Sequence, residues 1–241
     1  MRPNYFDDDV AATYDDGAAD MFTADMLTAT VDFLADLAGD GSALELGIGT
    51  GRVAVPLHQR GVAVHGIELS EAMVAQLRAK PDAAGIDVTV GDFATVRAPG
   101  SYRLAYLVFN TIMNLTTQDE QVACFVNVAD QLEPGGVFVI EVSVPQLRML
   151  PPGQTIHPFT VESDYVGFDE YDVTTQGLVS HHYQFGKDRQ LSIPFRYVWP
   201  AELDLMARIA GMTLRERWGD WDRARFTADS TKHVSVWQKS G

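Results

Sequence analysis

Residues 44–53 read LELGIGTGRV, a short hydrophobic run that meets three glycines at alternate positions, Gly47, Gly49 and Gly51. The run predicts a buried strand, and the residues after the glycines predict a helix. A strand that enters a helix through glycines directs backbone N–H groups and the positive end of the helix dipole at one spot. Glycine also lets the backbone approach a ligand closely. The stretch therefore predicts a loop that holds a nucleotide-like cofactor.

The spacing of these glycines separates the loop from a dinucleotide site. The dinucleotide fingerprint G-x-G-x-x-G requires glycine at position 52, where this chain has Arg52. The spacing here is G-x-G-x-G, which favours a different nucleoside cofactor.

Acidic residues accompany three successive expected strands: Glu45, Glu68 and Asp92. A carboxylate in the position of Glu68 can accept hydrogen bonds from both ribose hydroxyls and repels a 2'-phosphate. Asp92 can accept a hydrogen bond from an exocyclic adenine amine, and Phe93 can pack on the ring. Each residue alone is also typical of a solvated loop, but the three together favour a cofactor site.

Strands and helices alternate through the first part of the chain. Residues 21–37 predict an amphipathic helix, and Ser70 can cap a later one. The expected strands are 43–46, 62–69, 86–92, 102–110 and 137–142, with a turn at 133–136; the expected helices are 52–61, 70–80 and 117–132. This order predicts an α/β fold, a Rossmann-like doubly wound sheet with helices on both faces.

The pattern changes after residue 144. Three segments rich in aromatic and β-branched residues, 164–174, 177–185 and 191–199, predict antiparallel strands with a hairpin turn at 186–189. A helix over 200–211 and strands over 212–221 and 233–239 follow. We therefore expect an N-terminal helical segment (1–40), a cofactor-binding core (41–144 and 200–241), and an antiparallel insertion (145–199) that covers the acceptor site or forms a dimer surface.

With these motifs the chain resembles the class I S-adenosylmethionine-dependent methyltransferases. The resemblance rests on ELGIGTG (45–51), GIELS (66–70), VGDF (90–93) and LEPGGVFVIEV (132–142). It implies S-adenosyl-L-methionine as the cofactor. The cofactor-binding residues that it implies are Glu45, Gly47, Gly49, Gly51, Glu68, Leu69, Asp92, Phe93 and Asn110.

The resemblance also implies what these residues do. The glycines would border the methionine part of the cofactor, with Glu45 near its ammonium group. Glu68 would bind the ribose, Asp92 and Phe93 the adenine, and Asn110 would lie near the methionine end or the acceptor. The residues ATYDD (12–16) and the late insertion look most like small-molecule enzymes of the aminodeoxysugar N,N-dimethyltransferase kind, from secondary metabolism. There a tyrosine placed like Tyr14 lines the pocket, although an ordinary core or surface aromatic fits as well.

Methyl transfer from a sulfonium needs alignment and exclusion of water, and it needs a base only if the acceptor arrives protonated. Adenine and cytosine N-methyltransferases carry [D/N]-P-P-[F/Y/W] where this chain has NTIM (110–113). Metal-dependent catechol-type enzymes carry an Asp-Asn pair where this chain has EVSV (141–144). We expect neither a nucleic-acid base as acceptor nor a metal ion.

Candidate bases lie in the expected strand 177–185, where neighbouring side chains point to opposite faces. His181 and His182 therefore cannot both face one pocket. The face of Val179, His181 and Tyr183 is the more apolar, and if it covers the cleft, His181 is the better placed base. A structural histidine is the alternative, and Tyr14 is the second catalytic candidate. A further apolar stripe either walls the acceptor site or forms core: Leu191, Ile193, Phe195, Tyr197 and Trp199.

The formal net charge of −15 would repel a nucleic-acid backbone over any long contact surface. The single cysteine, Cys124, has the spacing of a buried helix face. The N-terminus lacks a signal-peptide core and no run of 18 apolar residues occurs, so we expect a cytoplasmic protein without a membrane span.

The leading hypothesis is a methyltransferase for a small polar metabolite, with N-methylation ahead of O-methylation, and a homodimer is possible. One alternative is a protein that binds the cofactor without turnover, as a regulatory or assembly subunit. The other is an NAD-dependent oxidoreductase, because Tyr183 and Lys187 have the Y-x-x-x-K spacing of short-chain dehydrogenases. That pair must lie on a helix, whereas a strand and turn are expected here.

Overall fold

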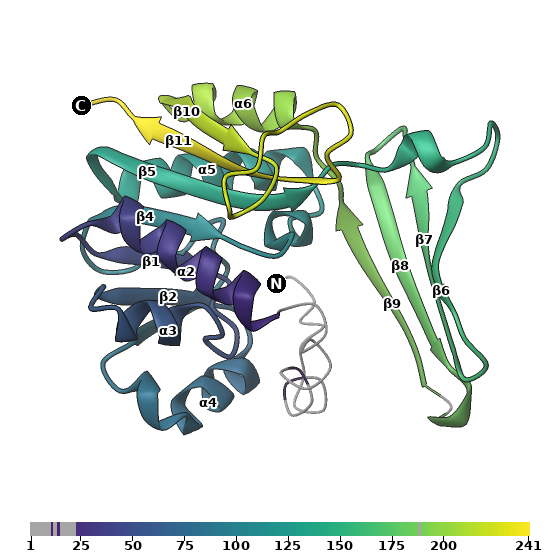
Figure 1. The fold of residues 1–241 in the computed structure, drawn as a ribbon, viewed down its shortest axis with the longest axis horizontal. Helices are drawn as coiled ribbons and strands as arrows, with labels where there is room; N and C mark the ends of the chain where they lie inside the picture. Colours follow the sequence, from purple (N-terminus) through teal and green to yellow (C-terminus); the bar gives the residue numbers. More distant parts are fainter. Residues whose placement is uncertain (1–10, 12–13, 15–22, 188) are drawn as a thin grey trace.

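The computed structural model describes Ala11, Tyr14 and residues 23–187 and 189–241. They form a seven-stranded sheet in the order β10-β11-β5-β4-β1-β2-β3 and a four-stranded sheet in the order β6-β7-β8-β9 (Figure 1). The strands of the large sheet are β1 (Ala43–Leu46), β2 (Val64–Glu68), β3 (Asp87–Val90), β4 (Tyr102–Leu107), β5 (Leu132–Ser143), β10 (Met212–Trp218) and β11 (Lys232–Lys239).

Strands β1 to β5 are parallel, and β11 joins β5 antiparallel and forms a hairpin with β10. Strand order reverses at β1, which lies between β2 and β4. In open α/β sheets, ligands bind outside the carboxyl ends of the strands at such a switch point. The predicted α/β doubly wound fold is confirmed, and its topology points to the glycine loop after β1.

Helices cover both faces of the large sheet, as the alternation within β4 shows. Leu104 and Tyr106 pack in one core cluster, while Ala105 and Leu107 pack in the other. The first cluster includes α2 (Ala24–Ala38) and α3 (Ala54–Gln59); the second includes α5 (Gln118–Gln131) and α6 (Pro200–Ile209). Two-sided burial explains why these strands read as continuous hydrophobic runs.

Side-chain caps fix where the helices begin. Ser70 accepts a hydrogen bond from the N–H of Met73 at the start of α4 (Glu71–Ala79), as predicted. Thr117 and Glu120 form a reciprocal capping box at the start of α5. Cys124 is buried within α5, as its spacing predicted.

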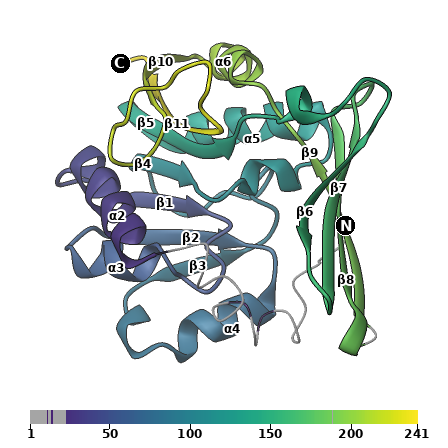
Figure 2. The ribbon, with the colours of Figure 1, turned by 45° about the vertical axis from the view of Figure 1, so that its right-hand side comes forward.

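The small sheet consists of β6 (Ile156–Val161), β7 (Tyr165–Asp172), β8 (Gly177–Gln184) and β9 (Arg189–Arg196), all antiparallel. It stands across from the carboxyl ends of the parallel strands (Figures 1 and 2). Strand β6, which contains Pro158, was not predicted from the sequence. Proline has no N–H to donate to a ladder, and β6 is an edge strand, where that loss is tolerated.

A buried arginine ties the small sheet to the helices of the large one. Arg196 at the end of β9 donates hydrogen bonds to Gln121 Oε1 of α5 at 2.5 Å and to Glu202 Oε1 of α6 at 2.7 Å. Gln176, before β8, also donates to Glu202, at 2.7 Å. These contacts fix the position of the small sheet relative to α5 and α6.

Two local predictions are wrong. The turn expected at 133–136 lies within β5, beside a register shift between Tyr102 and Leu104 in the β4–β5 pairing, and Gly135 has a φ of 74°. Trp199, expected in a strand, is instead the N-cap residue of α6.

The segment boundaries 1–40, 41–144, 145–199 and 200–241 stay a prediction, and most of residues 1–22 lie outside the described part of the chain. Within the described part, no helix is long and apolar enough to cross a bilayer.

Candidate active site

The glycine loop adopts a conformation that only glycine takes without strain. Gly47, Gly49 and Gly51 have φ values of 70°, 54° and 76°. A Cβ on Gly51 would lie 2.2 Å from Leu77 Cδ1, and one on Gly47 would lie 2.8 Å from Thr111 Cγ2. The loop therefore passes close to α4 and to the segment after β4, at the carboxyl edge of the sheet.

Glu68 ends β2 against this loop. Its Oε2 accepts a hydrogen bond from the N–H of Gly49 at 2.9 Å, and its Oε1 accepts one from the N–H of Ser70 at 2.8 Å. Burial raises the pKa of Glu68, and these backbone hydrogen bonds act in the opposite direction. The carboxylate is thus held beside the loop, with further lone pairs to accept hydrogen bonds from a ligand. Its ribose contact stays a prediction.

Glu45 lies within β1 and is buried. Its Oε2 accepts a hydrogen bond from Tyr106 Oη at 2.9 Å, and burial raises the pKa of Glu45 to about 8. A cation nearby would favour the ionised form. The proposed contact with the ammonium group of the cofactor is therefore compatible with this chemistry, although the structure brings Glu45 to Tyr106 and not to the acceptor cavity described below.

The loop after β3 lies next to the glycine loop. Asp92 Oδ1 accepts a hydrogen bond from the N–H of Ala94 at 2.9 Å, which shapes the turn. Phe93 is buried, and a Cβ on Gly47 would lie 3.9 Å from its ring. Asn127 of α5 holds this loop through the carbonyl of Phe93. The structure thus gathers the segments of Glu68, Asp92 and Phe93 around one loop.

The segment after β4 has two successive non-glycine residues in the left-handed region, Phe109 with φ 57° and Asn110 with φ 60°. Such strain is held by its surroundings and gathers at functional sites. The N–H of Phe109 donates to Glu141 Oε2 at 2.8 Å, and Asn110 Oδ1 accepts from the N–H of Ser143 at 2.7 Å. Both anchors lie on β5, next to β4.

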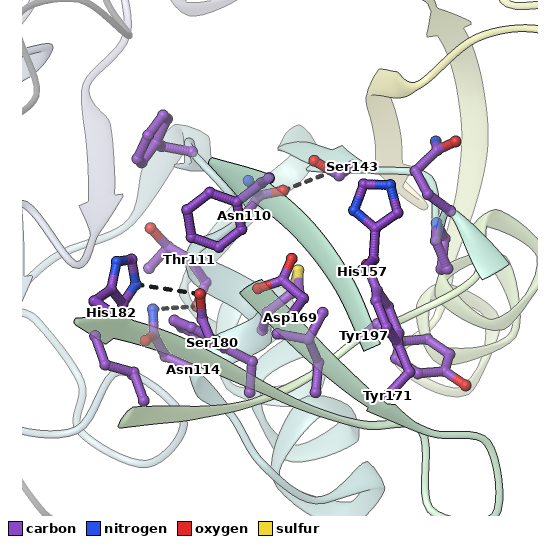
Figure 3. A pocket seen from close by; sticks show the side chains of 18 of the residues that line it. Asn110, Thr111, Asn114, Ser143, His157, Asp169, Tyr171, Ser180, His182 and Tyr197 are labelled. Carbon is purple, nitrogen blue, oxygen red and sulfur yellow. Dashed lines mark hydrogen bonds between the residues drawn. The ribbon is translucent and has the colours of Figure 1, made fainter. Parts of the chain in front are cut away.

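A cavity of about 660 Å³ lies between this segment and the small sheet (Figure 3). Phe109, Asn110 and Ser143 line it from the large sheet, and β6 to β9 line it from the opposite side. Tyr14 also lines it, and its ring centre is 5.4 Å from the guanidinium carbon of Arg52, which follows Gly51. Tyr14 therefore connects the glycine loop with the cavity, where the resemblance put it.

The face of β8 that covers the cavity is the polar one. Leu178, Ser180, His182 and Gln184 line the cavity, so the prediction that His181 faces it is wrong. The ring of His181 stacks on Phe168 at 4.8 Å between centres, and its Nδ1 is 2.9 Å from Ser192 Oγ. On the face of His181, side chains of β8 pack against those of neighbouring strands, as His181 does against Phe168. The more apolar face of β8 therefore did not identify the side that lines the cavity.

The expected stripe does line the cavity, through Leu191, Ile193 and Phe195 of β9 and Tyr197 just after it. Trp199 lies beyond the strand and is not among the lining residues. The dehydrogenase interpretation requires Tyr183 and Lys187 to lie on one helix. Tyr183 instead lies on β8 and Lys187 in the turn after it, so that interpretation is not supported.

Asp169 of β7 is a cavity residue that sequence analysis did not single out. It sits in register with His157 of β6 and Ser180 of β8. Burial raises the pKa of Asp169, whereas the Ser180 hydroxyl and the nearby histidines lower it. The available signal was the period of two in β7, which puts Tyr165, Asp169 and Tyr171 on one face.

His182 belongs to the same polar cluster. Its Nδ1 is 2.6 Å from Tyr165 Oη, and its Nε2 is 3.2 Å from Ser180 Oγ. Burial lowers the pKa of His182, and the charge of Asp169 raises it. Among the described residues, no group of three or more His, Cys, Asp or Glu is arranged to hold a metal ion.

Comparison with known proteins assigns the family. A family model described as a methyltransferase domain matches residues 43–136. The structure of the CcbJ methyltransferase from Streptomyces caelestis is 37% identical, covers 96% of each chain and superposes with a TM-score of 0.84. The chain belongs to the class I S-adenosylmethionine-dependent methyltransferases. Two more distant similarities are to the amino pentose methyltransferase CalS10 from Micromonospora echinaspora (19% identity, all of each chain, TM-score 0.67) and to a cypemycin N-terminal methyltransferase from Streptomyces sp (23% identity, 98% of each chain).

The chain is therefore a methyltransferase that uses S-adenosylmethionine, which favours an enzyme over the silent binding protein and the oxidoreductase. The bound cofactor supplies a methyl group activated by the positive sulfur. The glycine loop, Glu68 and the Asp92 turn are the parts of this chain that fit its binding. Tyr14, Asn110 and the small sheet line the same cavity, and their roles in positioning the acceptor against the donor and in excluding water stay predictions.

Proposed function

We propose that this methyltransferase transfers its methyl group to the amine nitrogen of a small acceptor. The observation that carries the proposal is the carboxylate of Asp169 in a cavity whose other walls are rich in aromatic rings. A carboxylate attracts an ammonium group, and aromatic faces attract cations as well. A neutral hydroxyl acceptor can donate a hydrogen bond to the carboxylate but has no positive charge to pair with it or with the aromatic faces.

The relatives support this choice. CalS10 is named an amino pentose methyltransferase and the cypemycin enzyme an N-terminal methyltransferase, and both an amino pentose and an N-terminus carry an amine. The net charge of −15 disfavours nucleic acid and is compatible with a cationic acceptor. We propose a small metabolite, with aminodeoxysugars as the first class to examine, from secondary metabolism. A cytoplasmic site of action and a homodimer also stay predictions.

Methyl transfer from radiolabelled S-adenosylmethionine to matched acceptors tests the proposal. Amino sugars are compared with the same sugars carrying hydroxyl in place of the amine, and cyclic amines with the corresponding cyclic ethers and alcohols. We expect label only in the amines. Label in the hydroxyl partners alone would show an O-methyltransferase and overturn the proposal.

A further inference from the structure

We infer that Asp169 binds the acceptor as its ammonium cation and takes the ammonium proton, while Tyr165, His182 and Ser180 hold the carboxylate ionised and in place. This inference rests on the proposed amine acceptor. It concerns residues on β7 and β8, outside the glycine loop and the segment after β4.

The register of the small sheet puts Asp169 at the centre of the polar cluster. His157, Asp169 and Ser180 are direct neighbours on three adjacent strands. Figure 3 shows the Asp169 carboxylate pointing from the small sheet into the cavity, toward the side where Asn110 and Ser143 lie. The carboxylate is therefore directed at the part of the cavity formed by the large sheet.

The hydrogen bonds of the cluster have one consistent direction. An ionised carboxylate only accepts, so the hydroxyl of Ser180, the direct neighbour of Asp169 on β8, can donate its single proton to Asp169. Ser180 Oγ then accepts from His182 Nε2, which leaves His182 Nδ1 to accept from Tyr165 Oη. This series of hydrogen bonds requires a neutral His182, in agreement with the lowering of its pKa by burial. With this tautomer of His182, the donors form a series that runs from Tyr165 through His182 to Ser180, the neighbour of Asp169.

The cluster leaves the charge of Asp169 without a permanent counter-charge. The titratable groups around it are Tyr165 and Tyr171 on its own strand, His157 on β6, and His181 and His182 on β8. Among the described residues that line the cavity there is no Lys or Arg. A partly buried carboxylate of this kind is stabilised by a cation. An ammonium group supplies that cation and can also contact the faces of Tyr171 and Tyr197.

When the acceptor is a secondary ammonium ion, one of its N–H protons passes to Asp169, which frees the nitrogen lone pair. The nitrogen forms a bond to the methyl carbon while the methyl–sulfur bond breaks, and that electron pair stays on sulfur. The methylated amine leaves as an ammonium ion, S-adenosylhomocysteine leaves neutral at sulfur, and Asp169 returns its proton to water.

Binding of two small molecules of the same shape tests the inference without turnover. Piperidinium and tetrahydropyran are titrated calorimetrically into the protein saturated with S-adenosylhomocysteine. We expect D169N to weaken piperidinium binding by about tenfold or more and to leave tetrahydropyran binding unchanged. The matched control is E170Q, which makes the same charge change on a mostly exposed side chain of the neighbouring position. Equal piperidinium affinity in D169N and the unchanged protein would overturn the inference.

The pH dependence tests the holding residues. S180A removes a donor to Asp169, so the pH below which piperidinium binding fails should move upward, and Y165F should move it in the same direction by less. A role confined to packing would change the affinity without shifting the pH at which binding fails. An unchanged pH of failure in both variants would contradict the holding role. With an amine that the acceptor panel identifies as a substrate, D169N should lower kcat/KM about 100-fold at neutral pH. The kcat/KM of the variant should recover above the pKa of that amine. Amine methylation that D169N leaves intact refutes only the role of Asp169, whereas absence of any amine methylation refutes the proposed function.

Discussion

Gly167 on β7 makes room for the ring of Phe159 on β6, because a Cβ on Gly167 would lie 2.2 Å from Phe159 Cε2. The ring of Phe159 lines the cavity, and its centre is 5.5 Å from that of His182. The absence of one side chain thus lets an aromatic ring lie across the edge of the small sheet and pack beside the polar cluster.

Gly167→Ala should therefore displace Phe159 without unfolding the protein, since that ring is 44% exposed and can move outward. We expect the KM of the acceptor to rise by about three- to tenfold, with little change in affinity for S-adenosylhomocysteine. Gly186→Ala, in the turn between β8 and β9, is the control, because its Cβ would meet nothing within 4 Å. Steady-state kinetics and calorimetry measure both quantities, and equal KM values in the two variants would contradict the role of Phe159.

Glu68→Gln should weaken cofactor binding. The carboxamide keeps one acceptor oxygen for the N–H groups of Gly49 and Ser70 but loses the second, and it loses charge-assisted bonds to ribose hydroxyls. We expect the Kd of S-adenosylhomocysteine to rise about tenfold. Glu71→Gln, on an exposed side chain of α4, controls for the change of charge. Unchanged affinity in E68Q would remove Glu68 from the ribose site.

The conformation of the glycine loop and the placement of Glu68 and Asp92 near it could be predicted from the sequence because this geometry is local, whereas their contacts with the cofactor stay predictions. Glycines at 47, 49 and 51 are required by the backbone itself, and Glu68 and Asp92 follow strands whose hydrophobic runs mark them. The acceptor half depends on tertiary placement. A period of two in β8 separates His181 from His182, but only packing decides which of the two faces the large sheet. Asp169 was missed for the same reason, because its burial is set by strands on both sides.

His233 on β11 gives the fold an acid sensitivity. Burial lowers the pKa of His233 to about 3, with the charge of Arg217 acting in the same direction. The unfolded chain binds a proton near pH 6.5 and the folded chain does not, so stability is full above that pH and falls as the pH drops toward 3. We expect a slope of up to about 1.4 kcal/mol per pH unit from this group. Urea unfolding between pH 7.5 and 5 measures it, and His233→Asn should flatten it; an equally steep loss in the variant would exclude His233 as the source.

Glu202 contributes to the pH dependence of stability in a lower pH range than His233. Burial raises its pKa, but hydrogen bonds from Arg196, Gln176 and Gln118 outweigh burial and hold the pKa below the usual range. Its stabilisation is present above the ordinary glutamate pKa of about 4.3 and is lost as the pH falls through the lower folded value. Glu202→Gln should remove this dependence and loosen the small sheet, which hydrogen exchange in β9 would report. Unchanged exchange in β9 would show that Arg196 holds the sheet without Glu202.

Two substitutions of Asn110 distinguish the role of the backbone conformation after β4 from the role of the Asn110 side chain. Asn110→Gly keeps the left-handed conformation free of strain but loses the oxygen that accepts the N–H of Ser143. Asn110→Ala loses that oxygen but keeps a Cβ in the left-handed region, at a cost of about 1 kcal/mol relative to the glycine variant. We expect both variants to lower kcat/KM, with the alanine variant also less stable to urea by that amount. Full activity in the glycine variant combined with low activity in the alanine variant would show that the path of the backbone, and not the amide of Asn110, positions the acceptor against the methyl group.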